Sequence, residues 1–231
     1  MNKEKEVVGE MFNDIAPKYD FLNHFLSMGL DKVWRKKAVN QLKNKNPKHI
    51  LDVATGTGDF AIKLNKVLKS NVTGVDISEG MLKVGVEKIS KLGLSDSINL
   101  QVGDSTNLSF KDQEFDAVTV AFGVRNFENL NKGLSEMLRV TKENGKIVIL
   151  EFSKPRLFPF KQLYSFYSLK VLPFIGALFS SNKNAYTYLP KSVMAFPDGD
   201  KFLQIMENVG YKNCKRKVMS LGIVTIYTGI K

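Results

Sequence analysis

The clearest chemistry in this sequence is carried by aspartates that stand beside glycines. In LDVATGTGDF, residues 51–60, an apolar run passes into a glycine turn with Asp52 before it and Asp59 after it. Two more acids follow apolar runs, Asp76 in NVTGVD and Asp104 in INLQVGD. Glycines let a ligand approach the backbone closely, and carboxylates accept hydrogen bonds from ammonium, hydroxyl and amine groups. The combination predicts a site for a ligand that donates hydrogen bonds and carries positive charge.

Residues 56–61, GTGDFA, also match the loose G-x-G-x-x-A pattern of dinucleotide-binding turns, and Asp76 stands where a ribose-binding acid would be expected. A pyrophosphate would lie against the turn and the start of the following helix, where Asp59 would repel it. S-adenosylmethionine would not be repelled, because it presents an ammonium group, a ribose diol, an adenine amine and a sulfonium charge. The residues expected to bind it on these grounds are Asp52, Gly56, Gly58, Asp76 and Asp104.

These acids can meet only if the strands that carry them lie in one sheet. Short β-branched or aromatic runs alternate with segments whose apolar residues recur at helical spacing. Helices of this length between strands make right-handed crossovers, so we expect a doubly wound α/β fold with a mostly parallel sheet covered on both faces. In such a sheet the ligand lies beyond the carboxyl ends of the strands. The expected strands are residues 49–54, 71–76, 98–104, 115–122 and 146–152.

The two ends of the chain depart from this alternation. Before the first strand, residues 10–20 and 31–43 have helical patterns. After the last, residues 198–211 are helical by pattern, and two strand-like runs are separated near residues 220–222. We expect N-terminal helices and a C-terminal antiparallel hairpin that completes the sheet.

The length and composition predict one domain. The 231 residues, 43% of them hydrophobic, are enough for a substantial core. We divide the domain into an N-terminal helical cap (1–46), a cofactor-binding core (47–151), an aromatic and basic insert (152–197), and a helix and hairpin that complete the sheet (198–231).

We expect neither a signal segment nor a membrane span. The N-terminal stretch MNKEKEVVGEMF contains no apolar h-region, and the longest apolar run, residues 171–179, is far shorter than the roughly 18 residues that a span requires. These features predict a cytoplasmic protein. The single cysteine, Cys214, excludes a disulfide or a cysteine-based metal site within one chain, and we expect no metal.

Positive charge is concentrated outside the core. The chain has a formal net charge of +11. Residues 152–197 contain no Asp or Glu, six Lys or Arg, and nearly half of the aromatic residues. This composition predicts that the insert faces an apolar substrate or an anionic membrane surface.

The turn after the first strand, the acid on the second strand and the terminal hairpin resemble the class I S-adenosylmethionine-dependent methyltransferases. Residues 19–36, YDFLNHFLSMGLDKVWRK, and residues 139–155, RVTKENGKIVILEFSKP, resemble the two signature regions of the quinone-ring C-methyltransferases of menaquinone and ubiquinone biosynthesis. FGVRN, residues 122–126, resembles a third segment of that family. The similarity runs from about residue 8 to the end of the chain.

This resemblance implies S-adenosyl-L-methionine as the cofactor. It also implies that Thr57, Asp76, Asp104 and Ser105 contact the cofactor, the last two near the adenine.

Two positions depart from the family pattern. The family usually has a histidine three residues before the signature tryptophan, whereas this chain has Asp31 before Trp34. The usual Pro-Gly-Gly turn is Glu-Asn-Gly here, residues 143–145. The second change is mild, because asparagine tolerates the left-handed conformation. The first leaves the assignment of the acid and base open.

The resemblance implies a prenylated quinol as the substrate, with demethylmenaquinol favoured and a benzoquinol left open. Such a molecule has a flat ring and a long hydrocarbon tail and resides in a bilayer. Basic residues near an anionic surface contribute about 1 kcal/mol each, so we expect peripheral contact with the inner face of the membrane. The residues expected to line the substrate path are Phe158, Phe160, Tyr164, Phe166, Tyr167, Phe174 and Phe179, and those expected to face headgroups are Lys154, Arg156, Lys161 and Lys170.

Methylation of a ring carbon is favoured when the adjacent hydroxyl loses its proton, because electron density at the carbon then rises. Arg125, just after the fourth expected strand, could stabilise the phenolate. His24 has the titration range of a general base, and Asp20, Asn23 and Asp31 compete for that role. The catalytic candidates are therefore Arg125, His24 and Asp31.

Three other functions remain open on the sequence alone. An RNA methyltransferase would also be basic, but the basic residues here alternate with apolar aromatic ones, so we expect no nucleic acid partner. A nicotinamide-dependent reductase is disfavoured by Asp59 and by the lack of a separate substrate domain. A binding module without catalytic activity is the third. The sequence leaves the oligomeric state open.

Overall fold

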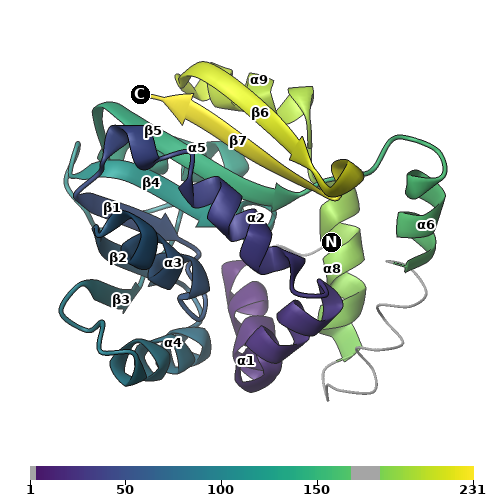
Figure 1. Ribbon diagram of the computed structural model, residues 1–231, viewed down its shortest axis with the longest axis horizontal. Coiled ribbons are helices and arrows are strands. Elements are labelled where there is room, and N and C mark those ends of the chain that lie inside the picture. The colour runs from purple at the N-terminus through teal and green to yellow at the C-terminus, as the bar shows by residue number, and fades with distance from the viewer. Residues whose placement is uncertain (1–3, 168–182) are drawn as a thin grey trace.

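The computed structural model describes residues 4–167 and 183–231. Its centre is a seven-stranded sheet in the order β3-β2-β1-β4-β5-β7-β6 (Figure 1). Strands β1 to β5 run parallel, and β7 pairs antiparallel with both β5 and β6. The doubly wound sheet and the C-terminal hairpin are therefore confirmed. The strands are β1 (His49–Val53), β2 (Asn71–Asp76), β3 (Ile98–Val102), β4 (Phe115–Ala121), β5 (Thr141–Phe152), β6 (Lys212–Met219) and β7 (Val224–Ile230).

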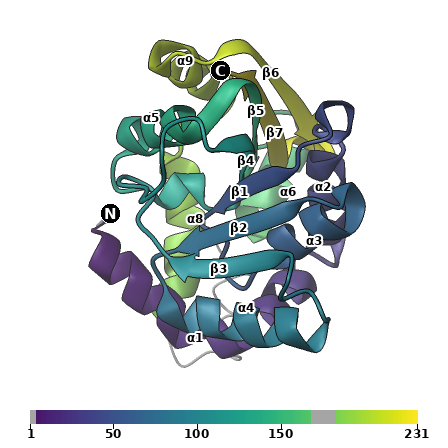
Figure 2. The same cartoon turned by 90° about the vertical axis from the view of Figure 1, so that its left-hand side faces the viewer.

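Helices cover both faces of the sheet, because successive residues of each strand point to opposite sides. Ile50 of β1 packs in one core with Trp34 of α2 and Phe60 of α3. Its neighbour Leu51 packs in a second core with Leu134 of α5 and with residues of α9. Helices α2 and α3 therefore lie on one face and α5 and α9 on the other (Figure 2). The α-helices described are α1 (Lys5–Leu26), α2 (Leu30–Val39), α3 (Asp59–Leu68), α4 (Glu79–Lys91), α5 (Leu130–Val140), α6 (Phe160–Phe166), α8 (Lys183–Ala195) and α9 (Asp200–Val209), and the short 3-10 helices are η1 (Lys43–Lys45), η2 (Val124–Asn126) and η4 (Ser220–Gly222).

Helix α1 is longer than the predicted helix at residues 10–20. Apolar residues recur along it at Val8, Ile15 and Leu22, and all three are buried. The helix continues through Pro17, which has no N–H to donate to the helix. Burial of this apolar stripe outweighs the lost hydrogen bond, so the proline does not end the helix.

The turn before the main part of β5 has the conformation expected for Glu-Asn-Gly. Asn144 has φ of 59°, in the left-handed region that asparagine tolerates better than most residues. The pairing of β4 with β5 shifts register across this turn, between Thr141 and Lys146. Asparagine at residue 144 is therefore compatible with the backbone conformation of this turn.

The insert is described only at its two ends, which contain α6 and α8. Phe174, Phe179 and Lys170, which were expected to serve the substrate or the membrane, lie outside the described residues. Within the described ranges, no helix combines the length and the apolar character that crossing a bilayer requires.

Candidate active site

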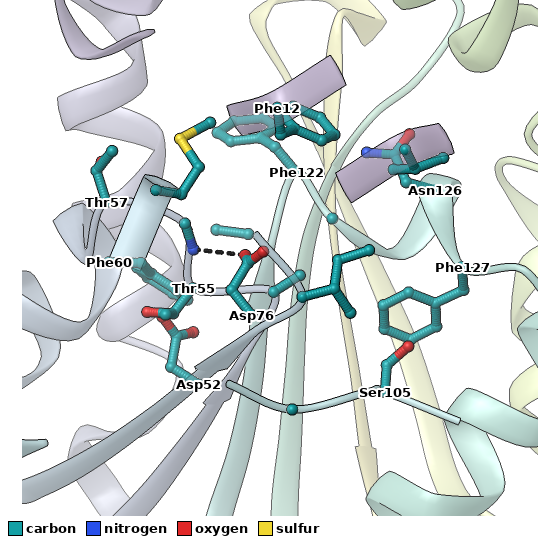
Figure 3. A pocket seen from close by; sticks show the side chains of 18 of the residues that line it. Phe12, Asp52, Thr55, Thr57, Phe60, Asp76, Ser105, Phe122, Asn126 and Phe127 are labelled. Carbon is teal, nitrogen blue, oxygen red and sulfur yellow. Dashed lines mark hydrogen bonds between the residues drawn. The ribbon is translucent and has the colours of Figure 1, made fainter. Parts of the chain in front are cut away.

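A cavity of about 90 Å³ lies where β1, β2, β3 and β4 end, and helix α1 forms its opposite wall (Figure 3). Strand β1 lies between β2 and β4 in the sheet, so the cavity is at the point where the strand order reverses. Open α/β sheets bind ligands at this point. We call it the cofactor cavity. Helix α1 contributes Lys5, Val8, Phe12 and Tyr19 to its lining.

The glycine turn after β1 closes one end of the cofactor cavity. Gly56 and Gly58 have φ of 56° and 78°, which side-chain-bearing residues rarely adopt. The Gly56 N–H donates a hydrogen bond of 2.8 Å to Oδ2 of Asp76, drawn as a dashed line in Figure 3. The acid at the end of β2 therefore fixes the shape of the turn at the end of β1.

Asp52 lies at the floor of the cofactor cavity and is almost completely buried. Its two carboxylate oxygens accept hydrogen bonds from the hydroxyls of Thr119 at 2.7 Å and Thr55 at 2.8 Å. Burial raises the pKa of Asp52 to about 7, although both hydroxyl bonds favour the ionised form. A cationic group in the cavity would favour the ionised carboxylate.

Asp76 and Asp104 stand in different electrostatic environments. Burial raises the pKa of Asp76, and the hydrogen bonds that it accepts from the backbone N–H groups of Ser78 and Gly56 limit the rise. Burial also opposes ionisation of Asp104, but hydrogen bonds from the backbone and hydroxyl of Thr106, with a contribution from Lys5, lower its pKa overall. Both carboxylates line the cofactor cavity, so its polar lining suits a ligand with several hydrogen-bond donors.

The structure brings most of the predicted cofactor residues together. Gly58 does not line the cofactor cavity. It precedes Asp59, the first residue of α3, and a Cβ at Gly58 would lie 3.4 Å from Leu100. The predicted residues that do line the cavity are Asp52, Gly56, Thr57, Asp76, Asp104 and Ser105.

Asp59 does not contribute an unpaired negative charge. Its Oδ1 lies 2.7 Å from Nζ of Lys88, and its Oδ2 lies 3.9 Å from the Arg35 guanidinium. Burial alone would raise its pKa, but these two cations outweigh that effect and lower it. The repulsion of a pyrophosphate that was expected at Asp59 is therefore offset, and the negative character of the cofactor cavity comes from the acids at the strand ends.

A second, smaller cavity of about 70 Å³ adjoins the cofactor cavity, and we call it the middle cavity. The two share Tyr19, Arg35 and Phe122 as lining residues. Among the residues that the structure describes, the charged side chains that line the middle cavity are those of Asp31, Arg35 and Arg125. A group held here would lie between the cofactor cavity and the insert residues Phe152, Tyr188 and Leu189, which also line the middle cavity.

The middle cavity leads into a third cavity of about 290 Å³ with a mainly apolar lining, which we call the apolar cavity. The two share Trp34 and Phe152. Helices α6 and α8, the loop between α1 and α2, and η4 form its walls. Of the aromatic residues expected to line a substrate path, Phe160, Tyr164 and Tyr167 line this cavity.

Arg125 lies at the middle cavity, but its guanidinium is already engaged. The side chain is buried, and its Nη1 lies 2.7 Å from Oε1 of the fully buried Glu151. It also donates to the carbonyl of Phe122 and lies over the ring of Phe152, 5.4 Å from its centroid. Arg125 and Glu151 form an ion pair in the wall, so the net charge presented there is small.

His24 and Asp31 lie together, although only one of them lines the middle cavity. Nδ1 of His24 is 2.8 Å from Oδ2 of Asp31, and Nε2 is 3.6 Å from Oδ2 of Asp59. His24 is half-buried and faces an outer depression, whereas the buried Asp31 lines both that depression and the middle cavity. These three side chains have the composition of a metal site. The Arg35 guanidinium, which contacts both acids, supplies positive charge there already.

Sequence reasoning missed the cations that complete this region. Arg35 stands four residues after Asp31, the spacing at which oppositely charged side chains meet on a helix, so a signal for their ion pair existed. The ion pairs of Lys88 had no such signal in the sequence, because its partners Asp20 and Asp59 are distant in the sequence. Glu151, the last acid of β5, lies next to Arg125 only because β4 and β5 are neighbours in the sheet.

Solved structures share this fold at low sequence identity. A possible histamine N-methyltransferase from Thermotoga maritima, described as S-adenosylmethionine-dependent, superposes with a TM-score of 0.67 at 18% identity, over 96% of this chain and 99% of that one. A putative S-adenosyl-L-methionine-dependent methyltransferase from Methanococcus maripaludis gives 0.67 at 18%, over 98% and 94%. The class I methyltransferase fold is thus confirmed.

Relatives of much higher identity span the whole chain. The demethylmenaquinone methyltransferase of Bacteroides fragilis is 50% identical over 230 residues, 99% of this chain and 94% of the relative. The ubiquinone/menaquinone biosynthesis C-methyltransferase UbiE of Geotalea daltonii is 48% identical over 233 residues, 100% and 99%. The model of the ubiE/COQ5 methyltransferase family matches residues 1–231. The chain therefore belongs to the ubiE/COQ5 methyltransferase family, and its cofactor is S-adenosylmethionine.

Proposed function

We propose that this protein methylates a ring carbon of a prenylated quinol, with demethylmenaquinol as the favoured substrate. The cofactor cavity, the middle cavity and the apolar cavity follow one another and share lining residues, so a donor, a ring and a hydrocarbon tail each have a compartment in the required order. The names of the two relatives, one of which refers to demethylmenaquinone, support the naphthoquinol.

The donor end of this arrangement is built from strand-end acids. Bound S-adenosylmethionine supplies an electrophilic methyl group on a sulfonium centre. We assign Asp52 to its ammonium group, Asp76 to its ribose diol, and Asp104 with Ser105 to its adenine, in the order of the neighbouring strands β1, β2 and β3 that carry or precede them. Gly56 and Thr57 complete the contact through the turn. Three carboxylates around one ligand favour a cation over a polyphosphate.

The acceptor ring is assigned to the middle cavity. Burial raises the pKa of both Tyr19 and Tyr188, so these phenols stay protonated near neutral pH. Asp31 is the carboxylate that lines this cavity among the described residues, and we assign it the proton of the quinol hydroxyl. His24, which contacts Asp31 from the outer side, is assigned to support that carboxylate. Arg125 is assigned to orient the phenolate, held in place by Glu151.

The mouth of the apolar cavity supports contact with a membrane. Met28, Leu163 and Leu221 line this cavity and are 81%, 60% and 58% exposed. Phe158 lies outside the cavity and is 82% exposed. These side chains come from the α1–α2 loop, the insert and η4, and we call them the apolar rim. An apolar rim around an apolar cavity suits transfer of a substrate directly from a bilayer.

The basic residues of the insert differ in how available their side chains are for contact with lipid headgroups. Lys154 is turned toward Asp198, 3.2 Å away, and toward carbonyls of the chain. Arg156 lies 3.6 Å from the same acid but is largely exposed, and Lys161 is exposed. Lys161 and Arg156 are therefore the better candidates for contact with anionic lipids.

The test supplies the purified protein with S-adenosylmethionine and a reduced demethylmenaquinol or a demethylated benzoquinol in separate reactions. We expect the naphthoquinol product to gain one methylene by mass spectrometry. Exclusive methylation of the benzoquinol would show that the substrate is a benzoquinol and not demethylmenaquinol. Binding of the cofactor with no methylation of either quinol would overturn the proposed substrate class.

A further inference from the structure

We propose that Lys88 is a positioning residue for the cofactor, which holds helix α1 closed over the glycine turn. Its ammonium group reaches two carboxylates from different elements, Asp20 of α1 at 2.6 Å and Asp59 of α3 at 2.7 Å. It also lies 3.3 Å from the hydroxyl of Thr57 in the turn. One side chain on α4 thus contacts three separate parts of the cofactor site. The proposal rests on the function given above only for the identity of the cofactor.

Helix α1 extends across the cofactor cavity and is tied down along its length. Near its start, Lys5 lies 3.4 Å from Asp104. Further on, Oδ1 of Asn13 accepts a hydrogen bond of 2.7 Å from the hydroxyl of Ser78. Near its end, Asp20 accepts a hydrogen bond of 2.5 Å from the hydroxyl of Thr57. Because α1 provides one wall of the cofactor cavity, these contacts hold that wall in place.

The packing of α4 explains how Lys88 reaches so far. Gly85, one turn earlier on α4, has no side chain, and a Cβ there would lie 3.1 Å from the carbonyl oxygen of Thr57 and 2.6 Å from Leu100. Only glycine lets α4 approach the glycine turn this closely. Helices α1 and α4 lie side by side beneath the sheet (Figure 2). Lys88 therefore lies within reach of both the turn and α1.

The charges around Lys88 make its removal costly. Asp20, Asp59 and Lys88 are each about a quarter exposed, so the medium around them screens their charges only in part. Without the ammonium group, the two carboxylates would face each other across the space it occupied. Their repulsion would push α1 away from Thr57. The nearby side chains of His24 and Arg35 lie farther from Asp59, at 3.6 Å and 3.9 Å, and contact Asp31 as well, so they replace Lys88 only in part.

The test measures binding of S-adenosylhomocysteine by calorimetry to the full chain and to Lys88→Met. We expect the variant to bind at least about tenfold more weakly, a change of about 1.4 kcal/mol. With a quinol acceptor, the KM for S-adenosylmethionine should rise by a similar factor while kcat at saturating cofactor changes little, because closure affects cofactor binding and not the chemical step. The matched control is Lys91→Met, on the same helix and exposed, which should bind like the unmodified protein.

A second variant separates positioning from a loss of stability. Asp20→Asn combined with Lys88→Met removes the repulsion between the carboxylates, so the double variant should recover part of the affinity that Lys88→Met loses. Hydrogen exchange in α1 should be faster in Lys88→Met and slower again in the double variant. Unchanged affinity in Lys88→Met, or a double variant that binds no better, would overturn the proposal. Failure of the unmodified protein to bind S-adenosylhomocysteine would contradict the cofactor assignment itself, so the two failures are distinguishable.

Discussion

The ionisation of Asp52 links ligand binding in the cofactor cavity to pH. Its pKa is raised to about 7 from an ordinary value of 3.8 because the carboxyl is buried. Between these two pH values the folded chain keeps a proton that the unfolded chain has lost. The contribution of Asp52 to stability is therefore fully present below about pH 4 and is lost as the pH rises through about 7. Folding thus favours the protonated carboxyl of Asp52, whereas a bound cation favours its ionised form.

Cofactor affinity should consequently rise with pH over the range in which Asp52 ionises. We expect binding of S-adenosylhomocysteine to tighten about tenfold between about pH 5.5 and pH 7, below the pKa of the ligand's own amino group. The measurement is a calorimetric titration at several pH values. Asp52→Asn keeps the shape but cannot ionise, so its affinity should show a much smaller pH dependence. An equally steep dependence in Asp52→Asn would assign the titration to another group.

Single residues could be predicted where their type and the end of a strand coincide. Asp76 and Asp104 were found because acids at the carboxyl ends of neighbouring parallel strands must lie close together. Lys88 and Glu151 could not be found in this way. Each acts through partners that only the packing of helices or the order of strands brings near. Their charges change the field of the site, so the electrostatics of the cavities could be predicted only in part.

Trp34 connects α2 to η4, the short 3-10 helix between β6 and β7. Its Nε1 donates a hydrogen bond of 2.8 Å to the hydroxyl of Ser220 in η4. Its ring packs edge-on against Phe122 and Phe152, with centroid distances of 6.2 Å and 6.3 Å. The same ring lines the middle cavity and the apolar cavity. One side chain therefore joins the N-terminal helices, the C-terminal hairpin and the walls of the cavities.

Replacement of Trp34 should destabilise the fold measurably. We expect Trp34→Phe to lower the free energy of unfolding by about 2–4 kcal/mol, because it loses buried volume and leaves its hydrogen bond unmade. Ser220→Ala, which removes the hydrogen-bond acceptor and little else, should cost about 1 kcal/mol. Denaturant unfolding monitored by circular dichroism measures both. Equal losses in the two variants would mean that the hydrogen bond, and not the packing of the ring, stabilises this junction.

Most elements could be predicted because the alternation of apolar runs and turns specifies them locally. The five parallel strands and the terminal hairpin follow the sequence pattern within a few residues. The predicted extent of α1 was too short, since the burial of Val8 and Leu22 depends on tertiary packing that the sequence pattern around Pro17 does not reveal. The start of β5 differed too, because Thr141 already pairs with Phe115 of β4 before the turn at Asn144.

Exposed apolar side chains from several parts of the chain lie at the mouth of the apolar cavity. The sequence pointed to the insert alone for membrane contact. The structure adds Met28 from the α1–α2 loop and Leu221 from η4 to the same mouth. The order of the three cavities could not be predicted either, since the middle cavity and the apolar cavity combine residues of α1 and α2 with residues of β5 and α8, which are distant in the sequence. Whole-molecule features of this kind depend on tertiary packing and leave no local signal.

Membrane binding should depend on the apolar rim. We expect the protein to cosediment with vesicles that contain anionic lipid at low ionic strength, and Met28→Ser with Phe158→Ser to reduce the bound fraction several-fold, because two exposed apolar side chains are lost. Val86→Ser is the matched control. Val86 is half exposed, at 50%, on α4 and lines none of the three cavities. Equal losses in the control, or no binding by the unmodified protein, would contradict the proposed role of the apolar rim.

The shared wall between the cofactor cavity and the middle cavity has a thermodynamic consequence. Tyr19 and Phe122 touch both compartments, so a ligand that shifts either ring changes the space available to the other ligand. Such linkage is reciprocal. If the bound methyl donor changes the affinity for the quinol by some factor, the bound quinol changes the affinity for the donor by the same factor. The affinities of the cofactor cavity and the middle cavity therefore cannot be changed independently at Tyr19 or Phe122, because a substitution of either ring alters both.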